Sequence, residues 1–147
     1  IITWHLPEGT GDFLLPKKAT SGSMAYDLVS PTNYHLDGFN EFGVGKLLIS
    51  TLVAVSIPKG YALILGSRSS LVTNNITVEA GWIDADFKLP IKVVLYNHGQ
   101  SPYEIKAGDR IAQARLVKVY DLKERVLWTY PNPDSTSRKG GFGSTGK

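Results

Sequence analysis

Short runs of apolar residues, several of them alternating with polar ones, recur along most of the chain. The clearest are GKLLISTLVAVSIP, YALILGS, ITVEA, IKVVLYN and RIAQARLVKVY, at residues 45–58, 61–67, 76–80, 91–97 and 110–120. Alternation places one face of a strand in a core, so each run predicts a β-strand. Turn-forming residues such as Pro58-Lys59-Gly60 separate the runs, and only residues 69–73 suggest a turn of helix. Many short strands predict an all-β sandwich or barrel, with a jelly roll among the options.

The segment 131–147, PNPDSTSRKGGFGSTGK, differs from the rest because Pro, Ser, Thr and Gly crowd together in it. We therefore divide the chain into a β domain over residues 1–130 and a flexible tail over residues 131–147. The final GGFGSTGK fits G-x-G-x-x-G and most of the P-loop pattern. Both patterns need a helix after the glycines to hold a phosphate, and no helical sequence follows here. A disordered tail and a phosphate grip of another kind both remain open.

Composition narrows the class of protein. The 147 residues are 42% hydrophobic and 20% charged, as in a single soluble globular domain. The absence of cysteine excludes disulfides, thiolate zinc sites and cysteine nucleophiles, and suggests an intracellular protein. No apolar run approaches the roughly 18 residues of a membrane span, so we expect no membrane contact. The net charge of +3 is small and scattered, which favours a local anionic ligand over a nucleic-acid face.

Two stretches carry residues suited to nucleotide chemistry. In GSRSSL, Arg68 stands beside small hydroxyl residues just after an apolar strand, an arrangement that can hold phosphate oxygens. The alternative is an arginine paired with a surface carboxylate. In GWIDADFK, Asp84 and Asp86 are predicted to lie on one side of a strand-like stretch, where a carboxylate could act as a general base. The alternative is a polar turn with solvated aspartates.

A third stretch, AGDRIAQ, reads as a hairpin turn that enters a strand. Simple alternation turns Arg110, Ala112 and Ala114 to one face and Ile111 and Gln113 to the other. A glutamine on an apolar face needs a hydrogen-bond partner. The histidines His5, His35 and His98 have no partner at metal-ligand spacing, so we expect no metal site built from protein side chains.

Together these stretches resemble the trimeric dUTPase family, whose members carry five short motifs in a fixed order. MAYDLVS is similar to the first motif, GSRSSL to the second and AGWIDADFKLPIKVVLYN to the third; AGDRIAQ matches the fourth and RKGGFGSTG resembles the fifth. Each motif alone is a weak signal, but five in order from residue 24 to residue 146 are specific.

The resemblance implies a jelly-roll homotrimer with shared active sites that hydrolyses dUTP to dUMP and pyrophosphate. It makes Asp84 the residue that deprotonates the attacking water. It also implies Mg²⁺, held mainly by the triphosphate, with Asp27 acting on the metal indirectly through water. The substrate-binding residues carried over are Arg68, Ser69, Ser70 and Gln113 for phosphates, Gly81 and Ile83 in the hairpin that reads uracil, Phe87 against deoxyribose, and, from a neighbour's tail acting as a lid, Arg138, Phe142, Gly143, Ser144 and Thr145.

Some residues depart from the family pattern. Ala25 replaces a usual glycine, and Phe87 replaces a tyrosine while keeping the ring. Arg138 lies four residues before Phe142 where family arginines commonly lie five before, which leaves open the basic residue that meets the γ-phosphate.

Two other functions are compared. The related dCTP deaminases need a glutamate at the position of Val94, and valine cannot transfer a proton. A non-catalytic or moonlighting binding module of the same fold is the other alternative, and the segment His35–Gly43 fits no motif.

Overall fold

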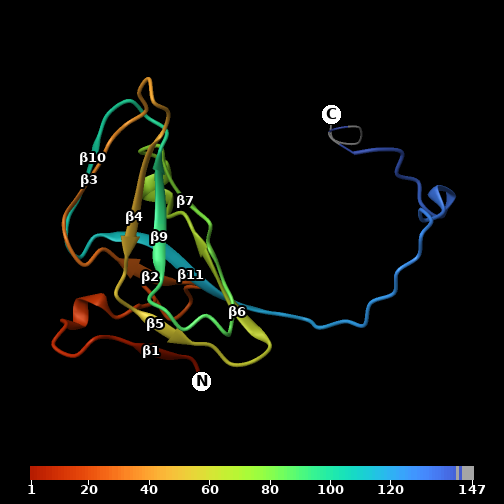
Figure 1. The fold of residues 1–147 in the computed structure, drawn as a ribbon, viewed down its shortest axis with the longest axis horizontal. Coiled ribbons are helices and arrows are strands. Elements are labelled where there is room, and N and C mark those ends of the chain that lie inside the picture. The colour runs from red at the N-terminus through yellow and green to blue at the C-terminus, as the bar shows by residue number, and fades with distance from the viewer. Residues whose placement is uncertain (142, 144–147) are drawn as a thin grey trace.

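The computed structural model describes residues 1–141 and 143, and it is built almost entirely of antiparallel β-structure (Figure 1). The larger sheet has the order β2-β11-β6-β8, formed by Tyr26–Val29, Arg110–Lys118, Tyr61–Gly66 and Trp82–Ile83. The second has the order β4-β9-β7, formed by Gly45–Ser50, Lys92–Asn97 and Ile76–Glu79. Two small sheets pair β1 (Thr3–His5) with β5 (Ala54–Ser56) and β3 (Tyr34–Leu36) with β10 (Tyr103–Ile105). The short helices are η1 (Asp12–Leu14), α1 (Ser69–Val72) and η2 (Pro133–Ser135).

One apolar core takes side chains from both main sheets. Leu63 of β6 and Ala114 of β11 come from one sheet, and Ile49 of β4 and Leu95 of β9 come from the other. All four are fully buried. The alternation of buried and exposed residues along β4 and β9 is the one that the sequence shows, and the predicted all-β fold is confirmed.

The longest apolar run is two strands and not one. The run at residues 45–58 breaks between β4 and β5, where Leu52 adopts a positive φ of 63°. The Thr51 hydroxyl is buried in this turn and donates a hydrogen bond to the Ile91 carbonyl at 2.8 Å. Hydrophobic pattern alone does not reveal this turn, because the residues that form it are themselves apolar or β-branched.

Adjacent residues of β4 test the assignment of the core. We expect Ile49→Ala to lower the free energy of unfolding by about 2–5 kcal/mol, because the side chain is 0% exposed and truncation leaves a cavity. Leu48→Ala is the matched control: this side chain is 55% exposed, and we expect a change within about 0.5 kcal/mol. Urea unfolding of both variants measures the difference, and equal losses would contradict the placement of β4.

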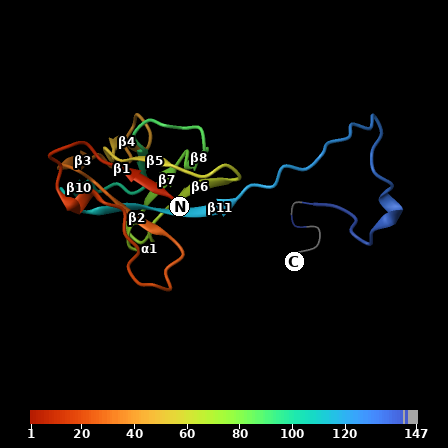
Figure 2. The same cartoon turned by 90° about the horizontal axis from the view of Figure 1, so that it is seen from below.

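The chain leaves the body after β11 as an arm. Every described residue from Lys118 onward is exposed, and both views show the arm running away from the sheets (Figure 1, Figure 2). The arm carries six large, mostly exposed apolar side chains, namely Tyr120, Leu122, Val126, Leu127, Trp128 and Tyr130. The division into residues 1–130 and 131–147 stays a prediction, but the strands of the body already end at Lys118. In the described part of the chain, no helix is long and apolar enough to cross a membrane.

Candidate active site

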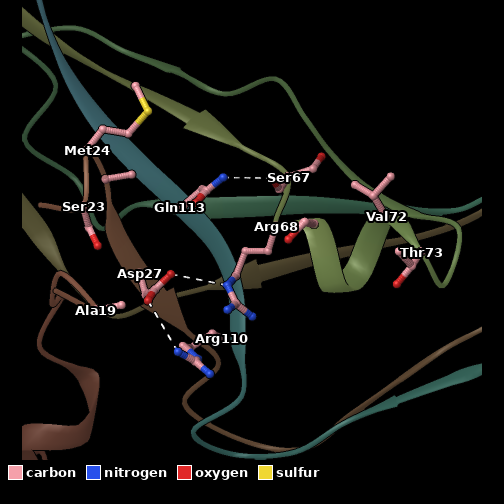
Figure 3. Close-up of a pocket in the computed structure, with 12 residues that line it drawn as sticks. Ala19, Ser23, Met24, Asp27, Ser67, Arg68, Val72, Thr73, Arg110 and Gln113 are labelled. Carbon is pink, nitrogen blue, oxygen red and sulfur yellow. Dashed lines mark hydrogen bonds and ion pairs between the residues drawn. The ribbon is translucent and has the colours of Figure 1, made fainter.

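The first half of the site is a cleft of about 690 Å³, here called the arginine cleft, between β2, β11 and the end of β6 (Figure 3). Its charged lining residues are Asp27, Arg68 and Arg110. Arg68 lies where β6 has ended and α1 begins, and Ser69 is the first residue of α1. The extended backbone of Arg68 followed by one helical turn therefore turns both side chains toward the same cleft. The predicted helical turn at residues 69–73 corresponds to α1.

Asp27 stands between the two arginines. Its Oδ1 lies 3.3 Å from Arg68 Nε, and its Oδ2 lies 3.8 Å from Arg110 Nη1. Arg68 also donates from Nη1 to Ser70 Oγ at 3.3 Å. The arginine thus pairs with a carboxylate, as one alternative proposed, but the carboxylate is only 17% exposed and lies inside the cleft. Pairing and phosphate binding are therefore compatible, because Asp27 fixes Nε and leaves the outer edge of the guanidinium available.

Gln113 lines the same cleft, and the predicted face for it is wrong. Arg110 pairs with Val29 while Ala112 pairs with Leu28, so Ile111 is an extra residue on β11. This β-bulge breaks the alternation, and both Ile111 and Ala112 are buried. Gln113 turns away from the core, and its side chain donates to the Ser67 carbonyl at 3.1 Å. The glutamine has the partner that its chemistry requires, but in a polar cleft and not on an apolar face.

The second half of the site is a cleft of about 540 Å³ beside β8, here called the Asp84 cleft. Ile83 pairs with Leu63 of β6 and is buried, so its neighbours Trp82 and Asp84 point outward into this cleft. Phe87 and Leu89 complete its apolar wall.

Gly81 brings β8 close to β6. A Cβ at this position would lie 2.7 Å from the Leu65 carbonyl oxygen, and the Gly81 carbonyl accepts a hydrogen bond from Leu65 N at 2.6 Å. Only glycine allows this approach, so Gly81 fixes the hairpin that carries Asp84.

Asp84 and Asp86 do not act as a pair on one face of a strand. β8 ends at Ile83, and residues 85 and 86 form a turn closed by a hydrogen bond from Phe87 N to the Asp84 carbonyl at 3.1 Å. Asp84 lines the cleft and Asp86 does not. The turn leaves Asp84 as the acidic residue of this cleft.

The predicted site residues therefore fall into separate groups within one chain. Asp27, Arg68, Ser69 and Gln113 line the arginine cleft, whereas Ile83, Asp84 and Phe87 line the Asp84 cleft; the two clefts share no lining residue. Ser70 lines an adjoining depression together with Arg68.

The tail residues stand apart from both clefts in the described structure. Arg138 and Gly143 are exposed on the arm, and Phe142, Ser144 and Thr145 lie outside the described residues. A single chain does not bring the proposed base and the phosphate-binding side chains into one cavity. Arg110 is a cleft residue that the sequence did not indicate, because the bulge that directs it has no pattern of its own.

His35 has carboxylate partners that sequence spacing did not reveal. Its Nδ1 contacts Glu104 across the β3–β10 pair, and its Nε2 lies 3.0 Å from Asp37 Oδ1. The hydrogen bond to Glu104, assisted by its charge and by Asp37, raises the pKa of His35 above its ordinary value. The cluster lies on the surface, and its residues line neither cleft.

Comparison with known proteins agrees with this arrangement. A sequence model of the dUTPase family matches residues 12–146. The deoxyuridine 5'-triphosphate nucleotidohydrolase of Candida albicans is 39% identical over 137 residues, covering 90% of this chain and 81% of that protein. The fowlpox virus protein of the same name is 39% identical over 134 residues, covering 90% and 89%. The solved dUTPase of Staphylococcus bacteriophage 80alpha shares the fold, with a TM-score of 0.74 at 22% identity over 90% of this chain and 99% of that one. From its motifs, its fold and these matches, the chain belongs to the dUTPase family.

Proposed function

We propose that this protein hydrolyses dUTP to dUMP and pyrophosphate, with Asp84 as the general base. The observation that carries the proposal is the position of Asp84, outward from β8 in a cleft walled by Phe87 and other apolar side chains. The apolar wall suits a base and a sugar, and the carboxylate can accept a proton from water at the sugar end of the nucleotide. The named activity of the Candida albicans and fowlpox virus relatives supports the same reaction.

The reaction divides between the two clefts. The oxygen of a water molecule attacks the α-phosphorus as Asp84 takes its proton, and the bond from that phosphorus to the bridging oxygen breaks to release pyrophosphate. Arg68, Ser69 and Gln113 bind phosphate oxygens and stabilise the negative charge that grows on the leaving group. Gly81 and Ile83 hold the hairpin in place, so that its backbone reads the uracil. Phe87 packs on the deoxyribose and leaves no room for a 2′-hydroxyl.

The residues present fit a magnesium ion that is held chiefly by the substrate. Within residues 1–141 and 143, no group of three or more acidic or histidine side chains could hold a metal by itself. Asp27 is the carboxylate of the arginine cleft, and both its oxygens already contact arginines, so it would reach Mg²⁺ through water. When bound, Mg²⁺ neutralises phosphate charge and favours departure of pyrophosphate. A structural Mg(II) ion is described for the dUTPase of phage phi11, a structural neighbour of this chain.

We further propose that complete sites form between copies of the chain. The Asp84 cleft and the arginine cleft share no residue, and the arm exposes large apolar side chains such as Trp128 and Tyr130. A trimer in which one copy supplies Asp84, a second supplies the arginine cleft and a third supplies the tail uses all three features. It also buries the apolar side chains of the arm.

Product analysis tests the reaction. With Mg²⁺ and dUTP, dTTP, dCTP and UTP in separate tubes, we expect dUMP and pyrophosphate from dUTP alone. Release of dUTP from dCTP would favour the deaminase despite Val94. No product in any tube, from a protein shown to be folded, would favour the binding module.

Subunit mixing tests the shared site. The Asp84→Asn chain and a chain lacking residues 138–147 are each expected to be nearly inactive. Co-refolded mixtures should regain activity, because a mixed trimer contains one site with Asp84 from the truncated chain and the tail from the full-length Asp84→Asn chain. Mixtures as inactive as the parents would contradict sharing.

A further inference from the structure

We infer that Arg110 is a second phosphate-binding arginine of this enzyme, aimed into the arginine cleft by the bulge in β11, an assignment that rests on the proposed placement of the triphosphate there. The resemblance assigns no role to Arg110, and simple alternation along β11 would direct it away from Gln113. The structure nevertheless places both side chains in the same cleft.

The bulge explains how two residues three positions apart share a face. In a regular strand, positions separated by an odd number point to opposite faces. The extra residue Ile111 between the pairs Arg110–Val29 and Ala112–Leu28 shifts the phase by one, so Arg110 comes to the side of Gln113. β-Bulges are a recurrent means of re-aiming a side chain beside a functional site. Here the displaced residue is an arginine, and the face that it reaches is the one with Arg68.

The charges of the cleft leave a place for an anion. Two arginines and one aspartate are the charged groups among its described lining residues, so the cleft carries a net positive charge. Arg68 is held firmly, at 3.3 Å from Asp27 and by the bond to Ser70, and its side chain is 21% exposed. Arg110 is 54% exposed and lies 3.8 Å from Asp27, beyond hydrogen-bond distance. Its guanidinium is therefore free to turn its fork of donors to a phosphate.

A purely structural role does not account for this geometry. An ion pair as long and as exposed as Arg110–Asp27 contributes little to stability, about 0–1 kcal/mol. Asp27 already has a nearer partner in Arg68. Arg110 is thus not needed to compensate a buried carboxylate, whereas its position, charge and freedom match what a phosphate chain requires (Figure 3).

Binding of a non-hydrolysable imido analogue of dUTP to the full-length protein tests the role. We measure it by calorimetry in EDTA, so that no metal mediates the effect, for Arg110→Gln, Arg110→Lys, Arg68→Gln and the control Arg115→Gln. Arg115 lies on the same strand outside the arginine cleft. We expect Arg110→Gln to weaken the analogue about 10- to 100-fold, the effect of losing a hydrogen bond to a charged group. Arg110→Lys should fall between, because it keeps the charge and loses the fork.

Three further readouts separate phosphate binding from structural damage. Inhibition by deoxyuridine, which has no phosphate, should be the same in Arg110→Gln and the unmodified protein, and so should the melting temperature. KM for dUTP should rise while kcat changes less, since the contact serves binding. An analogue affinity equal to that of the unmodified protein, with Arg68→Gln weakened, would overturn the role of Arg110 and leave the cleft assignment intact. Unchanged affinity in both variants would overturn the cleft assignment itself.

Discussion

Replacing Asp84 by asparagine is expected to lower kcat for dUTP by about 10²- to 10⁴-fold, the usual contribution of a positioned general base. Asparagine has the same shape and can still contact a water molecule, but it cannot take its proton. Asp84 is exposed and lies outside the core, so the exchange leaves no cavity. We therefore expect the fold and the affinity for the imido analogue of dUTP to survive. Steady-state kinetics and calorimetry on one preparation measure both quantities.

Asp86→Asn is the matched control for this prediction. Asp86 has the same side chain two residues further on, but it does not line the Asp84 cleft. We expect Asp86→Asn to keep most of the activity. Full turnover by Asp84→Asn would remove Asp84 as the base, and equal losses in both variants would point to damage of the turn and not to lost proton transfer.

The strands of the body could be predicted from the sequence where both faces of a strand have distinct surroundings. β4 and β9 alternate between core and surface, so their apolar residues recur at every second position. β1, β3 and β10 have three residues each, too few for a period to emerge. They depend on pairing with a partner strand, and pairing leaves no local pattern.

The candidate site shows the same division between local and long-range information. Arg68 and Gln113 could be placed with phosphate because their neighbours in sequence, a strand end and a hairpin entry, are local features. The bulge at Ile111 is set by the register of β11 against β2, which lies more than 80 residues earlier in the chain. Alternation therefore predicted the wrong face for Gln113 and gave no role to Arg110. The separation of Asp84 from the arginines depends likewise on how distant strands assemble.

The two clefts match the two chemical halves of dUTP. Trp82, Phe87 and Leu89 give the Asp84 cleft an apolar wall, and Trp82 is 86% exposed in the single chain. A uracil and a deoxyribose can pack against such a wall, whereas a triphosphate requires the charged and hydroxyl groups around Asp27. Replacement of the usual tyrosine by Phe87 keeps the apolar face on which this division depends. An active site divided in this way reacts only when the α-phosphorus lies between its halves.

Closure over that junction is the proposed task of the tail, and removal of residues 138–147 should expose its contribution. We expect the truncated chain to lose at least about a hundredfold in kcat/KM, because a loosely positioned α-phosphorus and an open site are poorly aligned for attack. The fold should be unaffected, since every described residue from Lys118 onward is exposed and none belongs to the core. The melting temperature and the elution volume on size exclusion should therefore match those of the full chain.

Arg138 is the part of this segment on which the structure bears directly. Its Nε donates to the Gly140 carbonyl at 2.8 Å and its backbone N–H donates to the Thr136 hydroxyl at 3.2 Å, so it shapes the turn that leads into the glycines. Arg138→Gln and Lys139→Gln in the full chain separate the two basic residues. If Arg138 meets the outer phosphates, its variant should reproduce much of the truncation while Lys139→Gln stays near normal. The reverse order would assign the contact to Lys139, and an unchanged rate in the truncated chain would confine the chemistry to the two clefts.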